Sequence, residues 1–417
     1  MKKDIIIIGG GAAGMMAAYS AALAGGTAVV FEKNEKLGKK LYITGKGRCN
    51  FTNAADMQEF MENIPRNPRF LYSAFAAFSN NDMISFLEEN GTKTKIERGK
   101  RAFPLSDKSS DVIKALNRAL VKRGVSVRLN EEVKDIWIEE GAVKGVVKEN
   151  NEKVSADAVI VATGGLSYPL TGSTGDGYTF SKKAGHSVTP LSTSLVPFDC
   201  DGICKEMQGL SLKNVRLSLW SSVNKKPLFS GVGEMSFTHF GVSGPLVLSA
   251  SSLIKDDFFK EGLFGKIDLK IALSEEDLKE RIIRETKSSP KRSIKALLEG
   301  LLPRSMVLVF LNLLSIPKER ILSELTKEER DELIRLLKAF PFNVYGKRGY
   351  NEAVITRGGI KVNEIDPKTM GSKIVRGLFF AGEVIDCDAL TGGFNLQIAW
   401  STGFLAGKSA ALFCNDI

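Results

Sequence analysis

The pattern of apolar and polar residues predicts an α/β fold at the start of the chain. Asp4–Ile8 is a short β-branched run, which is typical of a strand buried on both faces, and glycines follow it at once. Small residues from Met15 to Ala24 then predict a helix, and Ala28–Phe31 predicts a second strand that ends in Glu32. Alternating strand and helix character continues to about Pro190.

Alternating strand and helix character returns near Thr356, but the middle of the chain has a different pattern. Short alternating runs between Leu195 and Leu273, such as 215–220 and 266–271, predict a small antiparallel β unit. Helical spacing of apolar residues between Ser274 and Phe340, as in 322–333, predicts a helical subdomain. We therefore expect a Rossmann-like, doubly wound α/β domain made of both chain ends, residues 1–190 and 356–417, with an insert at 191–355 that comprises a β unit (191–273) and a helical subdomain (274–342).

Composition narrows the class of protein. The chain has 417 residues, of which 43% are apolar and 25% charged, and this excludes disorder, collagen and a coiled-coil rod. No apolar stretch has the length of a signal peptide or a bilayer span. Five cysteines, an odd and sparse number, favour free thiols in a reducing compartment. We expect a cytoplasmic protein without membrane contact.

The glycines after the first strand predict a dinucleotide site. Gly9, Gly11 and Gly14 form the pattern G-x-G-x-x-G between a strand and a helix, and Glu32 ends the next strand. Gly9 permits the tight turn, Gly11 the approach of a pyrophosphate, and Gly14 close packing of helix on strand. The helix N-terminus attracts the phosphates, and Glu32 accepts hydrogen bonds from a ribose hydroxyl.

Two later segments favour FAD over NAD. The apolar strand at 158–161 leads into Gly164–Gly165, and the strand at 377–381 leads into Gly382–Glu383. A third glycine pair, Gly392–Gly393, opens a helix that runs to about Phe413. Such a helix can point its positive end at a flavin ring. Three glycine-bearing strand ends suit one extended ligand along a sheet, and we expect non-covalent FAD.

The chain resembles a family of bacterial FAD-dependent oxidoreductases, the RdsA/BaiN/aminoacetone oxidase family of YhiN-like flavoproteins. The resemblance runs from Lys3 to about Ser409, and its most diagnostic segment is 38–53, which contains Gly45-Lys-Gly-Arg-Cys-Asn-Phe-Thr-Asn53. Motifs at 97–99, 103–104, 237–245, 382–386 and 392–397 also look like those of the family. The resemblance implies an FAD domain made of both chain ends with an insertion between them.

The motifs and the resemblance together give a set of expected cofactor-binding residues. The resemblance places 45–53 beside FAD, and five basic residues with no acidic one lie between Lys36 and Arg48. We expect their charge to stabilise reduced FAD, and Asn395–Gln397 to lie at the pyrimidine end of the flavin. The expected residues are Gly9, Gly11, Ala12, Ala13, Gly14, Glu32, Lys33, Lys40, Thr44, Gly45, Gly47, Arg48, Cys49, Asn50, Val133, Ala162, Thr163, Gly164, Gly382, Glu383, Asp386, Gly392, Gly393, Asn395, Leu396 and Gln397.

Cys49, Arg48 and His239 are the three candidates for catalysis. Cys49 could act as a general acid whose pKa is lowered by Arg48, or it could be a small packed residue. His239, which precedes an expected helix start at Ser243–Pro245, could be an acid–base group or a structural histidine. Cys387 has the same ambiguity as Cys49. Cys200 and Cys204 lack the further ligands that zinc requires, so we expect no metal.

No second complete glycine motif follows a strand, so we expect no dedicated NAD(P)H domain. Either NAD(P)H visits the flavin transiently as electron donor or another reductant serves. No C-x-x-x-x-C pair follows the first helix, which argues against disulfide exchange as the activity.

The 58 basic residues exceed the 48 acidic ones by ten, and two stretches together carry more than this entire excess. Between Gly91 and Arg128 eleven basic residues face three acidic ones, and between Lys279 and Arg304 eight face three. Such clusters indicate either a solvated basic face or a nucleic-acid surface. In the second case the phosphate contacts would come from Lys93, Lys95, Arg98, Lys100 and Arg101.

Two functions remain open. One is reduction of a uridine of ribosomal RNA to dihydrouridine by hydride transfer from FAD, for which the base must enter a pocket. The other is small-molecule flavin chemistry, either amine oxidation of the aminoacetone type or reduction of an unsaturated metabolite. The clustered charge favours ribosomal RNA as the partner.

Overall fold

The computed structural model describes residues 4–415; residues 1–3 and 416–417, at the two ends of the predicted FAD domain, lie outside this range. The chain divides into two compact units, which are described separately. Unit 1 contains residues 1–194 and 350–417, and unit 2 contains residues 195–349. Both chain ends thus contribute to unit 1, and unit 2 is a continuous insertion.

Unit 1 is built on a parallel sheet of five strands in the order β19-β10-β1-β2-β6. Their bounds are β1 Asp4–Ile8, β2 Thr27–Glu32, β6 Ser126–Leu129, β10 Ala158–Val161 and β19 Leu378–Phe380. Ile5, Ile7 and all four residues of β10 are fully buried, as expected for a sheet covered on both faces. The predicted doubly wound α/β class is therefore confirmed.

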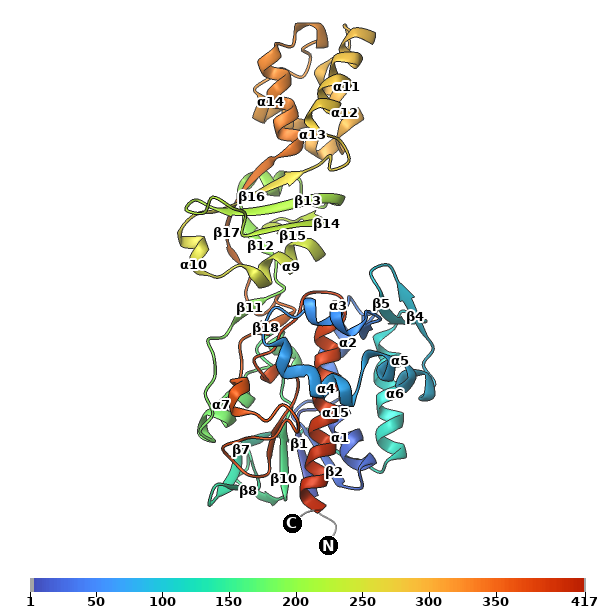
Figure 1. Cartoon of the computed structure of the whole chain (residues 1–417), viewed down its shortest axis with the longest axis vertical. Coiled ribbons are helices and arrows are strands. Elements are labelled where there is room, and N and C mark those ends of the chain that lie inside the picture. Colours follow the sequence, from blue (N-terminus) through green and yellow to red (C-terminus); the bar gives the residue numbers. More distant parts are fainter. Residues whose placement is uncertain (1–3, 416–417) are drawn as a thin grey trace. The chain divides into compact units, whose positions relative to one another are not determined.

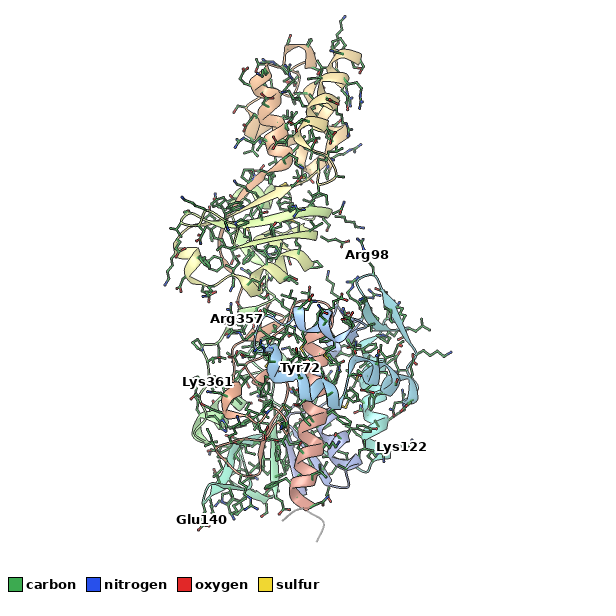
Figure 2. The ribbon with its side chains drawn as sticks, viewed as in Figure 1. Tyr72, Arg98, Lys122, Glu140, Arg357 and Lys361 are labelled. Carbon is green, nitrogen blue, oxygen red and sulfur yellow. The ribbon has the colours of Figure 1, made fainter. Side chains whose placement is uncertain are left out.

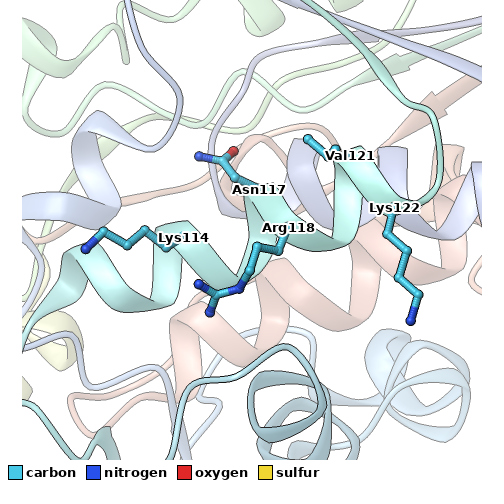
Figure 3. A pocket seen from close by; sticks show the side chains of 5 residues that line it. All are labelled: Lys114, Asn117, Arg118, Val121 and Lys122. Atoms are coloured by element: carbon cyan, nitrogen blue, oxygen red, sulfur yellow. The ribbon is translucent and has the colours of Figure 1, made fainter.

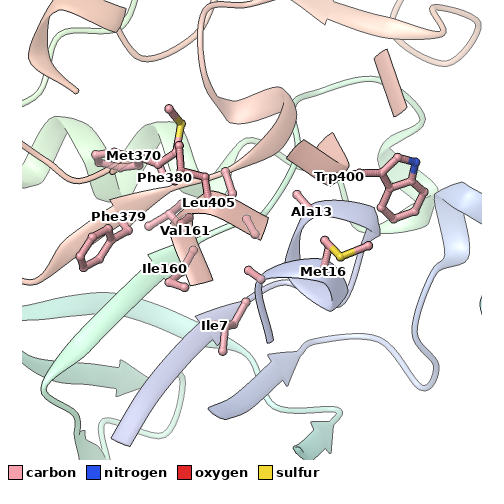
Figure 4. Close-up of a cluster of buried hydrophobic side chains, with 14 of the residues drawn as sticks. Ile7, Ala13, Met16, Ile160, Val161, Met370, Phe379, Phe380, Trp400 and Leu405 are labelled. Atoms are coloured by element: carbon pink, nitrogen blue, oxygen red, sulfur yellow. The ribbon is translucent and has the colours of Figure 1, made fainter. Parts of the chain in front are cut away.

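Helices α1 (Ala12–Leu23) and α15 (Phe394–Asn415) pack against each other and the sheet (Figure 1). A Cβ added to Gly403 would lie 2.4 Å from the carbonyl oxygen of Ala13, and one added to Gly407 would lie 2.0 Å from that of Ala17. The two backbones are therefore in direct contact, which only glycine permits. Figure 4 shows the buried side chains around this contact, with labelled residues from β1, α1, β10, β19 and α15.

Smaller elements surround this core. A hairpin of β4 (Thr94–Glu97) and β5 (Arg101–Pro104) pairs with the short β3 (Thr52–Asn53), and β7, β8 and β9 form a separate antiparallel sheet. The remaining elements of unit 1 are α2 Lys39–Ile43, α3 Met57–Glu62, α4 Tyr72–Ala77, α5 Asn80–Glu89, α6 Ser109–Lys122, β7 Val133–Glu139, β8 Ala142–Lys148, β9 Lys153–Ser155, α7 Asp176–Lys183, β11 Ser192–Ser194 and β18 Ile355–Arg357.

Unit 2 contains a closed barrel with the strand order β12-β15-β14-β13-β16-β17. The bounds are β12 Phe198–Cys200, β13 Ser211–Ser221, β14 Phe229–Phe237, β15 Gly241–Ser243, β16 Leu263–Asp268 and β17 Phe340–Lys347. β17 pairs antiparallel with β16 although more than seventy residues separate them in the chain. The β unit predicted at 191–273 therefore lacks one strand, because pairing at this separation leaves no local signal.

The helices of unit 2 lie mostly between those two strands. They are α8 Gly202–Glu206, α9 Pro245–Leu253, α10 Asp257–Lys260, α11 Glu275–Ser288, α12 Ile294–Leu301, α13 Arg304–Leu314 and α14 Lys327–Lys338. Within the helical pattern at 322–333, a 3-10 turn at Leu322–Glu324 precedes α14. Thr326 and Glu329 exchange capping hydrogen bonds of 3.1 and 2.8 Å, and this fixes the N-terminus of α14 at Lys327.

Candidate functional site

Four loops of unit 1 meet at one edge of the parallel sheet. Gly9 follows β1, Ala162–Gly164 follow β10, Gly382–Glu383 follow β19, and Glu32 is the last residue of β2. Because these strands are parallel and adjacent, their carboxyl ends lie side by side. In open α/β sheets this edge is where ligands bind.

The three glycines of the first loop have different surroundings. A Cβ on Gly9 would lie 2.6 Å from the carbonyl oxygen of Ala162, and one on Gly14 would lie 1.8 Å from that of Gly9. These two glycines allow contacts within the protein. Gly11 has no heavy atom within 4 Å of the position of an added Cβ, and its φ of −79° suits any residue. The protein itself therefore does not require glycine at position 11.

Glu32 is buried, and its carboxylate is held in place by three donors. The backbone N–H of Gly10 donates to Oε2 at 2.7 Å, and the backbone and side-chain nitrogens of Asn34 donate to Oε1 at 2.8 and 2.6 Å. A carboxylate has about four acceptor positions, so one remains for an outside donor. Neighbouring Lys33 points elsewhere, because its Nζ forms an ion pair of 2.6 Å with Asp176.

Lys40 and Glu383 join two parts of the site. Lys40 Nζ lies 2.7 Å from Oε2 of Glu383 and donates to the hydroxyl of Ser167 at 2.6 Å. Oε1 of Glu383 also accepts from the Ser167 hydroxyl and from the backbone N–H of Thr356, both at 2.8 Å. These bonds connect α2 with the loops after β10 and β19, and the carboxylate of Glu383 is the group that they share.

The 44–50 loop is tightly coiled. Gly45, Lys46, Gly47 and Cys49 all have positive φ, between 56° and 83°. The N–H of Cys49 donates to the carbonyl of Thr44 at 3.0 Å and closes the loop. The Oδ1 atom of Asn50 is buried and has no hydrogen-bond partner among the described residues. A buried acceptor of this kind is costly unless a ligand or water satisfies it.

Arg48 does not contribute the free positive charge that was expected. Its guanidinium donates to Asp107 at 2.7 Å and to Glu97 at 2.5 Å, and it lies over the ring of Phe103 with 4.4 Å to the centroid. These hydrogen bonds raise the pKa of Arg48 further and lower the pKa values of both carboxyls. Three further cations of the 36–48 segment, Lys36, Lys39 and Lys40, also lie within 4 Å of a carboxylate. The expected excess of charge is thus largely neutralised.

Cys49 is fully buried, and burial raises the pKa of its thiol. The expected lowering of this pKa by Arg48 is wrong, because the charge of Arg48 is already paired. Burial likewise raises the pKa of Cys387. A thiol with a raised pKa remains protonated and is a poor nucleophile.

We predict that none of the five cysteines reacts rapidly with a thiol reagent in the folded protein. The side chains of Cys49, Cys200, Cys204, Cys387 and Cys414 are all buried. Titration with Ellman's reagent at pH 8 should therefore give less than one fast thiol per chain. The same titration in guanidinium chloride should give five, and a fast thiol in the native protein would contradict the buried positions.

The first residues of α15 have side chains that bond within the protein. Asn395 Nδ2 donates to the carbonyl of Ala389 at 2.8 Å, and its Oδ1 accepts from the N–H of Ala389 at 2.9 Å. Gln397 is fully buried and bonds to Ser401 and to Phe78. The backbone N–H of Gln397 donates to the carbonyl of Gly393 at 3.2 Å, so a polar ligand contact from this segment would fall to the backbone N–H groups of Asn395 and Leu396.

Asn53 supports the same loop and was not among the expected cofactor residues. Its Nδ2 donates to the carbonyl of Gly392 at 3.0 Å and to that of Gly99 at 3.1 Å. A Cβ on Gly393 would lie 2.4 Å from the carbonyl oxygen of Thr52. The diagnostic 45–53 segment and the start of α15 are therefore packed backbone against backbone.

A buried charge cluster lies in the loop before α15. The Arg66 guanidinium lies 3.2 Å from Oδ1 of Asp386 and 3.2 Å from Oδ1 of Asp388. Burial, with a smaller contribution from the neighbouring carboxylates, raises the pKa of Asp388 to about 6 although Arg66 and Arg357 oppose the shift. Sequence reasoning found Asp386 but missed Arg66 and Asp388. The alternation of Asp386 and Asp388 around a cysteine was the available signal.

The remaining expected residues are more dispersed. Val133 is the buried first residue of β7, and Glu131, two residues earlier, donates its N–H to the carbonyl of Glu32 at 3.0 Å. Thr163 has a buried hydroxyl without a partner among the described residues. His239 belongs to unit 2, where its exposed imidazole contacts Phe240 edge-on. Among residues 4–415 no group of three or more metal-ligating side chains occurs.

These features fit FAD. The open position at Gly11 leaves room for a ligand against the backbone, and the N-terminus of the twelve-residue helix α1 offers N–H groups for a pyrophosphate. Glu32 retains an acceptor position for a ribose. The unpartnered Asn50 Oδ1 and Thr163 hydroxyl are polar atoms that a bound group with donors and acceptors would satisfy.

The comparison with protein families matches residues 3–409 to the HI0933-like protein Rossmann domain. The ribosomal RNA dihydrouridine synthase of Haemophilus influenzae is 32% identical over 390 residues, which are 93% of each chain. The 3-dehydro-bile acid delta(4,6)-reductase of Clostridium scindens is 30% identical over 398 residues, which are 94% of this chain and 95% of that one. The chain belongs to the HI0933-like family and is an FAD-dependent oxidoreductase.

Solved structures share the fold. A 3-ketosteroid-delta4-(5alpha)-dehydrogenase from Rhodococcus jostii aligns with a TM-score of 0.53 over 98% of this chain and 96% of that chain, at 17% identity. This match supports the architecture alone. None of the helices within residues 4–415 combines the length and the apolar character of a membrane span.

Proposed function

We propose that the chain binds FAD non-covalently along the sheet edge formed by β1, β2, β10 and β19. The observation that carries this proposal is the unfilled space at Gly11, which lies between the end of β1 and the start of α1. The pyrophosphate would lie against this position and the ribose against Glu32. Bound FAD supplies a carrier that accepts two electrons from a donor and passes hydride to a carbon–carbon double bond.

The residues of the chain have to orient this group and provide a proton. Reduction of a double bond adds one hydride and one proton, so a group that holds a proton near neutral pH is required. Asp388 is such a group, since its carboxyl titrates near pH 6 and is held by Arg66. It replaces Cys49 as the preferred candidate for a proton reservoir, because the raised pKa of the buried thiol leaves it a much weaker acid.

We propose ribosomal RNA as the substrate, with a uridine reduced to dihydrouridine in the cytoplasm. The dihydrouridine synthases of Haemophilus influenzae and of Escherichia coli are each 32% identical to this chain over 93% of its length. Among residues 4–415, three of the eleven cations between Gly91 and Arg128, namely Lys95, Lys100 and Lys114, have an ion pair with a carboxylate. Of the five expected phosphate contacts, however, Lys95 pairs with Asp107 and Lys100 pairs with Glu59. These two are poor candidates, whereas Arg98 at the hairpin tip is exposed (Figure 2).

The second candidate is reduction of an unsaturated small molecule. The bile acid reductase of Clostridium scindens is similar to this chain over nearly its whole length, at 30% identity. The same chemistry, hydride and proton addition across a double bond, would serve both substrates. NAD(P)H is the proposed transient electron donor in either case.

We predict that ribosomal RNA from cells without this gene lacks one or more dihydrouridines that are present in the parent strain. Digestion to nucleosides followed by mass spectrometry measures the difference, and the cloned gene should restore it. The purified protein with NADPH or NADH should form dihydrouridine in RNA from the deletion strain. Equal dihydrouridine content in both strains would reject the RNA substrate, and NAD(P)H oxidation that depends on a 3-keto-4-ene steroid would then favour the second candidate.

A further inference from the structure

Helix α6 presents a basic face to the solvent. Val112, Ala115, Leu116, Ala119 and Leu120 are its buried apolar positions, which recur at helical spacing and pack into the core of unit 1. Lys114, Arg118 and Lys122 occur at intervals of four residues on the opposite face, and all three are exposed. Together with Asn117 and Val121 they line a shallow, open groove (Figure 3).

This face carries little compensating negative charge. No acidic residue occurs between positions 112 and 130, whereas five basic ones do. Within the described structure the ion pairs of Lys114, Arg118 and Lys122 amount to a single contact of 3.4 Å between Lys114 and Asp111. Both of those side chains are at least partly exposed, so solvent and salt screen the contact. The face thus retains a charge close to that of its three cations.

Arg118 is held in a defined orientation by neutral groups. Its Nε donates to the carbonyl of Asn90 at 2.8 Å, and one terminal nitrogen donates to the hydroxyl of Thr92 at 3.3 Å. These acceptors fix the guanidinium without cancelling its charge. An arginine that is already oriented loses less side-chain entropy when it binds a phosphate.

The spacing of the cations favours an extended anion. Four residues of helix advance about 6 Å along the axis, so the three cations span about 12 Å in a row. A row of cations fits successive phosphates of a strand better than one compact anion. The exposed Arg123 and Arg128 continue the basic surface beyond the end of α6.

We infer that the outward face of α6, and not the β4–β5 hairpin, is the main surface on which this protein holds the phosphates of its RNA substrate. The inference rests on the proposed function, since it takes RNA as the substrate. It adds a binding surface that lies outside the loops at the sheet edge. The hairpin contributes less, because two of its four cations, Lys95 and Lys100, are paired with carboxylates.

The test compares two flavin-loaded variants with the same loss of charge. One is Lys114→Gln/Arg118→Gln/Lys122→Gln on α6. The control is Lys213→Gln/Lys225→Gln/Lys226→Gln, three exposed lysines of unit 2. Glutamine is a good helix former, so α6 should persist, and thermal melts and flavin spectra check this. Binding of protein-free ribosomal RNA is measured by fluorescence anisotropy between 50 and 200 mM salt.

We expect the α6 variant to bind RNA about 10- to 100-fold more weakly at low salt, and its salt slope to fall by about 2 to 3, as the loss of three phosphate contacts requires. The control should change affinity less than about threefold. Dihydrouridine formation should fall with affinity in the α6 variant alone. The single variant Lys122→Gln, on the last residue of the helix, should lower the slope by about 1 and serves if the triple variant is unstable.

Two results would overturn the inference, and they are distinguishable. If the wild-type protein binds and modifies RNA but the α6 variant matches the control, the surface is wrong and the proposed function stands. If the wild-type protein neither binds nor modifies ribosomal RNA, the surface and the RNA substrate are both wrong.

Discussion

The variant Gly11→Ala should lose FAD affinity by about 100-fold, or about 2.7 kcal/mol, while its fold remains intact. The added methyl group meets no protein atom within 4 Å, and the backbone at position 11 has an ordinary φ of −79°. The methyl group can therefore displace only a ligand that lies against the backbone at position 11. Alanine is a poorer N-cap than glycine, so the apoprotein should lose no more than about 1 kcal/mol of stability.

The measurement is a titration of apoprotein with FAD, followed by flavin fluorescence, together with a urea melt of the apoprotein. Gly202→Ala is the control: Gly202 is the first residue of α8, one position after a helix N-cap, and an added Cβ there also meets open space, as at Gly11, the N-cap of α1. Unchanged FAD affinity in Gly11→Ala would place the pyrophosphate elsewhere. Gly14→Ala is unsuitable as a probe, because its Cβ would lie 1.8 Å from the carbonyl oxygen of Gly9 and would disturb the fold itself.

The second large effect is expected for Asp388→Asn and depends on pH. The Asp388 side chain is 4% exposed, and burial raises its pKa from 3.8 to about 6. A carboxyl with a raised pKa in the folded state contributes its full stability below about pH 4 and loses it as the pH rises to about 6. Well above pH 6, ionisation of Asp388 therefore lowers the free energy of unfolding by about 3 kcal/mol relative to its value below pH 4.

Asparagine has nearly the same shape and cannot ionise, so the variant escapes this loss. The free energy of unfolding of Asp388→Asn, relative to wild type, should therefore increase by up to about 3 kcal/mol between pH 4 and pH 7.5. Urea melts of the flavin-loaded proteins at four pH values measure this. Asp257→Asn, at an exposed position of α10, controls for loss of a carboxylate. A difference that does not vary with pH would show that Asp388 is ionised throughout the range.

Separate measurements of the two flavin half-reactions distinguish a role of Asp388 in stability from a role in proton transfer. If Asp388 supplies the proton, the substrate-dependent reoxidation of reduced flavin should fall in Asp388→Asn, whereas the reduction of flavin by NAD(P)H should not. Loss of both half-reactions together would indicate a structural role through Arg66. The ion pairs of Arg66 with Asp386 and Asp388 make this comparison necessary.

Some features were decided by residues close together in sequence. The G-x-G-x-x-G spacing and Glu32 follow from local demands of a tight turn, a helix start and a strand end, so they could be recognised from the sequence. The strands at 4–8 and 158–161 were recognised because a strand covered on both faces needs an uninterrupted apolar run. These local patterns by themselves determined the parallel sheet and the edge where the ligand loops meet, whereas the class of oxidoreductase followed from the resemblance carried by segment 38–53.

Other features depend on contacts between distant residues, and only the tertiary structure decided them. The sequence predicts Arg48 as a free cation. Its charge is instead neutralised by Glu97 and Asp107, which follow it by about fifty and sixty residues. Likewise β17 pairs with β16 in the barrel although the two strands are far apart in the sequence. Arg66 and Asp388 form an ion pair although more than three hundred residues separate them. The physical reason is that local spacing sets backbone periodicity and turns, whereas burial and charge pairing depend on which distant side chains the fold brings within a few ångströms.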